Sequence, residues 1–327
     1  MNRIEFCGTS LLLVREPEVR LHLSVGTALA DLREALATVA GNGAVSRPRI
    51  RVDSREKGRA WLHTLRAGLP AWDVAGGKDY TSIGFATPAM WVSVIDTRTG
   101  LPLALVEADF LSRLRTAAVT ALATDLMAPP EPICLAHFGA GKIAEHLVEG
   151  VLLVRPSIRK VLLVRKRRSE GAPEWFSTLR GGVEGRLVEA EEALAEADVV
   201  TAATSSATPV IPVGAALPRL RHLNLIGSNH LKRKEIDVEL ARRCLPPAGF
   251  LVTDDPEQAE AEAGDFKDLV AEGALRWSEI PTLARLVADS TLRDRASEAS
   301  LTAFKSVGIG LMDLIVAAGL LRRMVKP

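Results

Sequence analysis

The stretch LAHFGAGKIAEHLVEG, residues 135–150, constrains the fold of this chain more than any other segment. The apolar run at residues 133–138 predicts a short buried strand, and the GAG that follows at residues 139–141 predicts a tight turn. Apolar residues then recur at helical spacing through Val148. A strand, a glycine turn and a helix in this order allow backbone N–H groups at the helix N-terminus to face a phosphate, because glycine has no Cβ atom in the way. Taken alone, the motif is also typical of an ordinary strand-to-helix connection.

The pattern around this motif predicts a doubly wound parallel sheet. After the proline-rich segment APPEP at residues 128–132, apolar runs alternate with helical patterns. The predicted strands cover residues 133–138, 161–164, 199–203, 223–226 and 250–252. The first two lie about one strand–helix–strand unit apart, so the glycine turn falls where such folds bind dinucleotides.

The first part of the chain predicts a second domain with a mixed sheet. Helical spacing at residues 29–39 leads into an extended basic segment, and residues 91–110 predict two strands around a turn at residues 96–100. A long helical pattern at residues 111–127 ends at the prolines that follow, because proline cannot continue a helix. A length of 327 residues also favours two domains over one.

Composition favours a small-molecule ligand. The 41 basic and 40 acidic residues nearly cancel, so no overall field attracts nucleic acid or an anionic membrane. The cysteines and histidines are scattered without disulfide or metal-ligand spacing, so we expect a reducing cytoplasm and no metal site. Arg3 and Glu5 stand where a signal peptide needs its apolar core, and Asp313 interrupts the apolar stretch at residues 307–321. We therefore expect neither export nor membrane insertion.

Four segments carry a resemblance to a known family. They are GGKDYTS at residues 76–82, DTRTGLPLALVEADFLSRLRTAAVTALA at 96–123, GAGKIA at 139–144 and TAFKSVGIGLMD at 302–313. Their order and spacing resemble the ornithine cyclodeaminase and mu-crystallin family over most of the chain. The resemblance implies a homodimer of two-domain subunits. It assigns residues 129–304 to a Rossmann-type dinucleotide-binding domain, and residues 1–128 with 305–327 to an α+β substrate-binding and dimerisation domain.

The resemblance also places a substrate carboxylate against three basic side chains. These match Lys78 in GGK, Arg115 in RTAA and Arg49 in RPRIR. An arginine fork and a lysine point charge both suit a planar carboxylate. Arg47 and Arg51 flank Arg49, so a solvated surface charge stays an equal alternative for Arg49.

Cofactor choice is predicted from the end of the second strand of the dinucleotide domain. An acidic residue there would bind the ribose 2′-hydroxyl, whereas a basic residue accepts a 2′-phosphate. Here the strand is followed by Arg165, Lys166, Arg167 and Arg168, so we expect NADP(H) to be preferred and NAD(H) to be possible. A basic loop that touches only solvent is the alternative.

The predicted cofactor-binding residues combine the glycine turn, this basic segment and positions implied by the resemblance. They are Thr116, Gly139, Ala140, Gly141, Lys142, Ile143, Arg165, Lys166, Thr204, Ser205, Ser306 and Val307.

The segment LIGSNHLKRKEID, residues 225–237, departs from the family pattern. Cyclodeaminases and the related alanine dehydrogenases carry an aspartate two residues after this glycine, where a carboxylate can act as a general acid or base; this chain has Asn229. An amide cannot exchange a proton at ordinary pH. Either Lys78 and water move the proton, or the reaction differs from cyclodeamination. The alternative is that Asn229 is only a turn residue after Gly227.

The sequence therefore predicts an NAD(P)H-dependent oxidoreductase acting at the α-carbon of an amino acid, by imine or ketimine reduction or by amino-acid dehydrogenation. Lys78, Arg115 and Asn229 are the candidate catalytic residues, and a fixed carboxylate would present the imine carbon to the nicotinamide. One alternative is an ornithine cyclodeaminase, which converts ornithine to proline and ammonia. Another is a crystallin-like protein that binds NADP(H) without turnover.

Overall fold

The chain forms two compact units. The computed structural model describes residues 2–6, 8–53, 60–81, 89–166, 170–212 and 214–325. Unit 1 contains residues 1–119 and 308–327, and unit 2 contains residues 120–307. The first boundary lies inside helix α3 (Asp109–Met127), and the second follows strand β15 (Leu301–Lys305). The sequence placed these boundaries after residues 128 and 304, because a proline-rich segment is a clearer signal in sequence than the middle of a continuous helix.

Unit 1 is built on a mixed eight-stranded sheet. Its strand order is β1-β2-β8-β7-β6-β5-β3, with β4 also paired to β5. Strands β2 and β8 are parallel, and the other pairs are antiparallel. The strands are β1 (Asn2–Phe6), β2 (Thr9–Val14), β3 (Val45–Ser46), β4 (Ile50–Asp53), β5 (Ala60–Leu69), β6 (Val74–Tyr80), β7 (Met90–Asp96) and β8 (Pro102–Glu107). The predicted turn between β7 and β8 is confirmed, and Gly100 N donates to the Asp96 carbonyl at 2.8 Å.

Helix α11 (Gly310–Val325) forms much of the core of unit 1. It contacts β5, β6, β7 and α2 (Val25–Asn42), and short helix α1 (Glu16–His22) also lies against it. Nearly every residue of α11 is buried, as expected for a helix that is apolar all round. A Cβ atom on Gly310 would lie 2.9 Å from the backbone carbonyl carbon of Leu65, so glycine permits this close approach to β5. Asp313 is buried by this packing.

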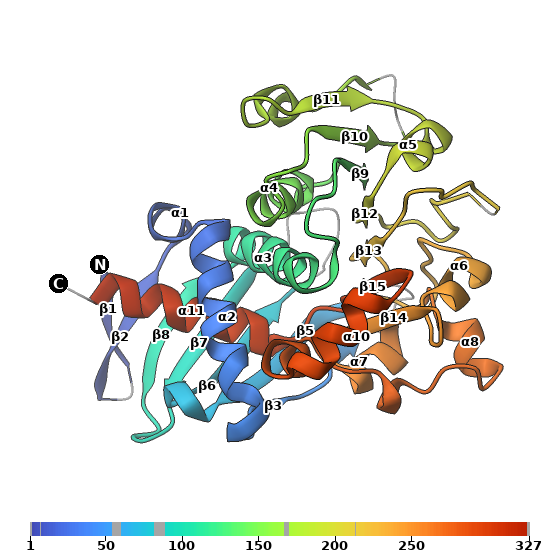
Figure 1. Cartoon of the computed structure of the whole chain (residues 1–327). Coiled ribbons are helices and arrows are strands. Elements are labelled where there is room, and N and C mark those ends of the chain that lie inside the picture. Colours follow the sequence, from blue (N-terminus) through green and yellow to red (C-terminus); the bar gives the residue numbers. More distant parts are fainter. Residues whose placement is uncertain are drawn as a thin grey trace. The chain divides into compact units, whose positions relative to one another are not determined.

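Unit 2 is the predicted doubly wound parallel sheet. Its seven strands have the order β11-β10-β9-β12-β13-β15-β14, and every pair is parallel (Figure 1). The strands before β15 are β9 (Cys134–Phe138), β10 (Lys160–Val164), β11 (Glu184–Leu187), β12 (Val199–Ala202), β13 (His222–Leu225) and β14 (Gly249–Thr253). The strand order reverses between β9 and β12. The carboxyl ends of these two strands therefore flank the crevice where this fold binds ligands.

Apolar side chains on both faces of this sheet form two cores. Ala136 and Phe138 of β9 belong to one core, and Leu135 of the same strand belongs to the other. The surrounding helices are α4 (Ala144–Val154), α5 (Ala190–Glu196), α6 (Val238–Arg243), α7 (Pro256–Glu262), α8 (Lys267–Ala271), α9 (Leu283–Ala288) and α10 (Ser290–Glu298). Strands β11 and β15 were not predicted. The sequence of β11 is largely polar at a sheet edge, whereas β15 is a short segment that includes a threonine and a lysine.

Candidate functional site

Lys78 lies in the middle of the unit 1 sheet because two glycines precede it. In β6, Gly76 and Gly77 have φ values of 153° and 157°. A Cβ atom on Gly76 would lie 2.0 Å from the carbonyl oxygen of Ser93, and one on Gly77 would lie 1.9 Å from that of Leu65. Glycine is therefore required for β6 to pass between β5 and β7 with this geometry. The Lys78 side chain is buried as a result.

Lys78 and Arg115 meet at one oxygen of Asp313. Lys78 Nζ and Arg115 Nε each lie 3.0 Å from Asp313 Oδ1. Ser112 Oγ lies 3.3 Å from the same oxygen and accepts from Lys78 Nζ at 3.2 Å. These side chains come from β6, α3 and α11, which are distant in sequence. Lys78 and Arg115, both predicted to bind a substrate carboxylate, are thus joined by a carboxylate of the protein itself.

Burial and charge shift the pKa values in this cluster. Burial, and after it the positive charge of Arg115, lower the pKa of Lys78 to about 8, although Asp313 opposes both effects. Burial acts to raise the pKa of Asp313, but Arg115 and Lys78 outweigh it and hold that pKa below the usual value. Asp313 is therefore ionised, and Lys78 is close to its midpoint under mildly alkaline conditions.

Arg49 reaches the same cluster from the segment before β4. Its Nη2 donates to the carbonyl oxygen of Gly308 at 3.1 Å, and its charge also lowers the pKa of Lys78. Gly308 lies against Arg115, because a Cβ atom on it would be 3.3 Å from both terminal nitrogens of that guanidinium. The three basic residues predicted to bind a carboxylate are therefore neighbours within unit 1. Thr116 donates its hydroxyl to the Ser112 carbonyl of its own helix at 2.7 Å.

The glycine turn follows β9 directly and leads into α4. Gly139 has φ of 112°, and a Cβ atom on it would lie 2.6 Å from the Ala203 carbonyl oxygen after β12. A Cβ atom on Gly141 would meet nothing within 4 Å, so the space beside this residue is open. Ile143, the N-cap of α4, has no side chain that can cap the first turn. Residues 139–143, including Ala140 and Lys142, thus form the kind of helix N-terminus that suits a phosphate.

Arg165 and Lys166 follow the last residue of β10. Arg165 Nη1 donates to the Gly171 carbonyl at 2.7 Å, and its Nη2 forms an ion pair with Glu170. The basic segment therefore starts with an arginine that an acidic neighbour already holds. Arg167 and Arg168, the other two basic residues of the predicted motif, lie outside the described residues.

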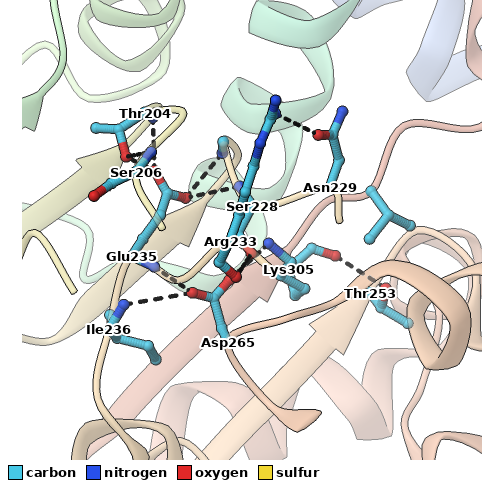
Figure 2. A network of polar contacts seen from close by, with 12 residues as sticks. Thr204, Ser206, Ser228, Asn229, Arg233, Glu235, Ile236, Thr253, Asp265 and Lys305 are labelled. Carbon is cyan, nitrogen blue, oxygen red and sulfur yellow. Dashed lines mark hydrogen bonds and ion pairs between the residues drawn. The ribbon is translucent and has the colours of Figure 1, made fainter. Parts of the chain in front are cut away.

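A buried carboxylate organises the loops after β12 and β13. Glu235 Oε1 accepts from the Thr204 backbone N–H at 2.7 Å and from its hydroxyl at 3.0 Å. Glu235 Oε2 accepts from Gly227 N at 2.8 Å and Ser228 N at 3.3 Å (Figure 2). The Thr204 hydroxyl, predicted to line the cofactor site, is thus directed to Glu235, whereas the neighbouring Ser205 is exposed.

Asp265 and Lys305 extend this network. Asp265 Oδ1 accepts from Glu235 N at 2.6 Å, and Asp265 Oδ2 pairs with Lys305 Nζ at 2.8 Å (Figure 2). The side chains of Asp265 and Lys305 are both fully buried. Burial raises the pKa of Glu235, and Lys305 opposes this shift. The network fixes the loops that carry Thr204 and Asn229.

Asn229 lies in the loop after β13, half-buried beside Arg233. Its Oδ1 accepts from Arg233 Nη1 at 3.0 Å, and its backbone N–H donates to the Gly227 carbonyl at 3.1 Å. Figure 2 shows the Arg233 side chain extending toward the Asn229 amide. The amide is therefore oriented by an arginine.

Ser306 and Val307 follow β15 and bind a buried aspartate. Ser306 Oγ donates to Asp254 Oδ2 at 2.9 Å, and Val307 N lies 3.1 Å from both oxygens of Asp254. Both predicted residues are buried, so the contacts described for them are structural ones within unit 2.

Four charged residues that hold these side chains and loops in place were not predicted as site residues. Asp313 carried a signal, because it is the one charged residue in the apolar stretch at residues 307–321, and a charge in a buried helix needs a partner. Glu235 and Asp265 carried no comparable signal, since they lie in mixed polar segments. Lys305 stands in the quoted motif TAFKSVGIGLMD, but the motif alone does not show that Lys305 pairs with Asp265.

Two further properties concern metals and membranes. Within the described ranges, no three His, Cys, Asp or Glu side chains are grouped so that they can hold a metal ion. None of the helices in the described part of the chain combines the length and apolar character of a membrane span.

The fold and the clustered residues define the class of protein: a two-unit protein with a Rossmann-type sheet and an α+β unit that gathers basic side chains around a buried aspartate. The model of the ornithine cyclodeaminase/mu-crystallin family matches residues 11–326. The chain belongs to this family.

Proteins similar to this chain in sequence and in structure agree with this assignment. The chain is 30% identical over 237 residues to Delta(1)-pyrroline-2-carboxylate reductase of Bacillus cereus, covering 72% of this chain and 71% of the relative. It is 30% identical over 310 residues to ketimine reductase mu-crystallin of Mus musculus, covering 92% and 93%. The structure of Delta(1)-pyrroline-2-carboxylate reductase of Thermococcus litoralis in complex with NADH and L-proline has a TM-score of 0.83 and 25% identity, covering 96% of this chain and 98% of that one.

Proposed function

We propose that this protein is an NAD(P)H-dependent oxidoreductase that reduces the imine of a 2-oxo acid, with cyclic imino acids such as Delta(1)-pyrroline-2-carboxylate as the substrate class. The observation that carries the proposal is the buried meeting of Lys78 and Arg115 at one oxygen of Asp313. Relatives named as a pyrroline-2-carboxylate reductase and a ketimine reductase support it.

The substrate carboxylate would bind to Arg115, Lys78 and Arg49. Lys78 and Arg115 share one carboxylate, Asp313, and Arg49 lies close enough to lower the pKa of Lys78. Two cations on one anion leave a net positive charge that attracts a carboxylate. Arg115 contacts Asp313 through Nε, which leaves its two terminal nitrogens for a bidentate contact. Fixing the carboxylate would also fix the direction of the neighbouring imine carbon.

The residues of unit 2 suit a dinucleotide. The open space beside Gly141 and the N-terminus of α4 would take the pyrophosphate. When bound, the nicotinamide cofactor supplies a hydride to the imine carbon. Arg165 and Lys166 would meet the ribose end at the end of β10, and they support a preference for NADP(H) over NAD(H).

Imine reduction also needs one proton on nitrogen for each hydride on carbon. Lys78 is the proposed donor, because its Nζ lies within the cluster that would hold the carboxylate next to the imine. A pKa of about 8 lets Lys78 be mainly protonated at neutral pH and still release the proton readily.

Asn229 supports reduction over cyclodeamination. Its Oδ1 accepts from Arg233, and an amide offers no carboxylate for the proton transfers that accompany ammonia loss. The Asn229 amide can still donate and accept hydrogen bonds, so its proposed role is to position a bound ligand.

A homodimer is also proposed. Ile4 and Phe6 of edge strand β1 are 43% and 51% exposed, and Ile50 and Val52 of β4 are 57% and 47% exposed. Exposed apolar side chains on edge strands favour association. Light scattering after size-exclusion chromatography would give the mass, and a monomer at micromolar concentration would contradict this proposal.

A nicotinamide absorbance assay tests the proposed function. Cyclic imino acids, and 2-oxo acids mixed with amines, would be screened with NADPH and NADH, and ornithine with the oxidised cofactors. We expect cofactor oxidation with at least one imino acid. Cofactor binding without turnover of any of these compounds would favour the crystallin-like alternative.

A further inference from the structure

Asp313 is used in an unusual way for a buried carboxylate. Its side chain has no solvent exposure, yet Lys78, Arg115 and Ser112 all contact Oδ1. Among the described residues, Oδ2 has no hydrogen-bond partner. A buried ion pair that served stability alone would gain most from using both oxygens, as in a bidentate contact with arginine. The shared oxygen therefore brings Lys78 and Arg115 together, while the second oxygen of Asp313 is left without a hydrogen bond from any described residue.

The orientation of Arg115 follows from this contact. Asp313 binds Nε, and Gly308 faces both terminal nitrogens at a distance where only a hydrogen fits comfortably. No described residue accepts a hydrogen bond from those two nitrogens. The Asp313 contact thus turns the double-donor edge of the guanidinium toward a further planar anion.

We propose that Asp313 is the positioning residue of the substrate-carboxylate clamp: one of its oxygens holds Lys78 and Arg115 side by side. This inference rests on the proposed function, because it assigns the anion at the clamp to the substrate. Asp313 itself does not touch the substrate in this account.

Charges around Lys78 explain why an anion is needed there. Arg115 on α3 and Arg49 before β4 both disfavour the charged form of Lys78, and Asp313 on α11 favours it. Ser112 accepts from Nζ, and the Tyr80 ring lies 5.6 Å from it. Without Asp313, the buried cations Lys78 and Arg115 would lose the carboxylate that they share. Lys78 would then lose its proton at a lower pH.

The first test measures Lys78 directly and needs no activity. Competitive labelling with acetic anhydride, read by mass spectrometry of the Lys78 peptide, gives the pH midpoint of this amine in the full-length protein. Asp313→Asn keeps the size of the side chain and removes its charge. We expect the midpoint to move from about 8 in the natural protein to a value lower by about 1–3 pH units in this variant.

The matched control is Asp31→Asn. Asp31 on α2 also pairs with α11, through two contacts of 2.7 and 2.8 Å to Arg323, but it lies outside the clamp. We expect this variant to leave the Lys78 midpoint unchanged. A similar shift in both variants would show that Asp313 only docks α11, and an unchanged midpoint in Asp313→Asn would overturn the proposal.

Steady-state kinetics give the second readout. For Asp313→Asn we expect KM for the imino acid to rise roughly tenfold or more. The decline of kcat/KM at alkaline pH should begin at a lower pH than in the natural protein. The dissociation constant of NADPH should stay unchanged. If Asp313→Asn does not fold, Asp313→Glu replaces it, and a Lys78 midpoint close to the natural value with a raised KM is then expected. A raised NADPH dissociation constant with an unchanged KM would contradict the role.

The two readouts separate this inference from the proposed function. If the natural protein reduces no imine but the Lys78 midpoint falls in Asp313→Asn, the proposed reaction is wrong and the hold of Asp313 on Lys78 stands. If imines are reduced and Asp313→Asn changes neither the midpoint nor KM, the reaction stands and the role of Asp313 is wrong.

Discussion

Arg233 donates from Nη1 to Oδ1 of Asn229 across 3.0 Å, and this contact determines what an aspartate could do at the same place. A carboxylate at position 229 would form an ion pair with Arg233, which would hold its pKa below the usual range. Such a group is a poor proton donor near neutral pH.

The first prediction concerns ammonia release from ornithine. The natural protein should release little or no ammonia with NAD or NADP present. Asn229→Asp alone should gain little, because Arg233 keeps the new carboxylate ionised, whereas Asn229→Asp combined with Arg233→Met should gain more. Ammonia is measured with a coupled assay, and Arg233→Met alone is the control. Efficient conversion of ornithine to proline by the natural protein would remove the argument from Asn229.

The second prediction concerns cofactor choice. Changing both Arg165 and Lys166 to alanine should weaken NADPH binding and leave NADH binding nearly unchanged, because only NADPH carries a 2′-phosphate. Glu170→Gln should have the opposite effect, since it releases the Arg165 guanidinium from its ion pair. Nicotinamide fluorescence titration gives both dissociation constants, and Lys267→Ala on α8 controls for the loss of an exposed charge in the same unit. Equal affinities for the two cofactors in the natural protein would refute the assignment.

The third prediction concerns the arginine fork. Arg115→Lys keeps the charge but loses the planar fork, in which Nε contacts Asp313 while the two terminal nitrogens bind a substrate carboxylate. We expect kcat/KM for the imino acid to fall roughly tenfold to a hundredfold. Arg98→Lys is the same exchange at an exposed ion pair in the turn between β7 and β8, and it should leave kcat/KM unchanged. Unaltered kinetics in Arg115→Lys would place this residue outside the site.

The fourth prediction concerns the buried network in unit 2. Lys305→Met leaves Asp265 and Glu235 without their buried cation, so the free energy of unfolding should fall by about 3–5 kcal/mol. Lys234→Met breaks a partly exposed pair with Asp268 and should cost less than about 1 kcal/mol. Urea unfolding followed by circular dichroism measures both. Equal losses would mean that Lys305 does not stabilise the two carboxylates.

The fold was largely predictable where local patterns decide it. Five strands of the unit 2 sheet appear as apolar runs, and the glycine turn after β9 has the predicted place in it. β11 was missed because an edge strand needs no apolar run. β15 was missed because a lysine usually indicates an exposed position, and only the structure shows that Asp265 pairs with it.

The site was predictable in part. The resemblance to the family's motifs predicted that Lys78, Arg115 and Arg49 lie close together, and the structure places them so. The role of Asp313 depends on contacts to residues 198 and 235 positions away, and no local pattern encodes such a pairing. The same holds for Glu235, whose contacts join the loops after two neighbouring strands.

The most direct measurement of the central claim is the reaction of the natural protein with Delta(1)-pyrroline-2-carboxylate. The protein, NADPH and this imino acid are mixed at neutral pH, nicotinamide absorbance is followed, and the product is identified by chiral chromatography. The account predicts one proline formed for each NADPH oxidised, with no ammonia released. The contradicting result is no NADPH oxidation with any cyclic imino acid, together with ammonia release from ornithine.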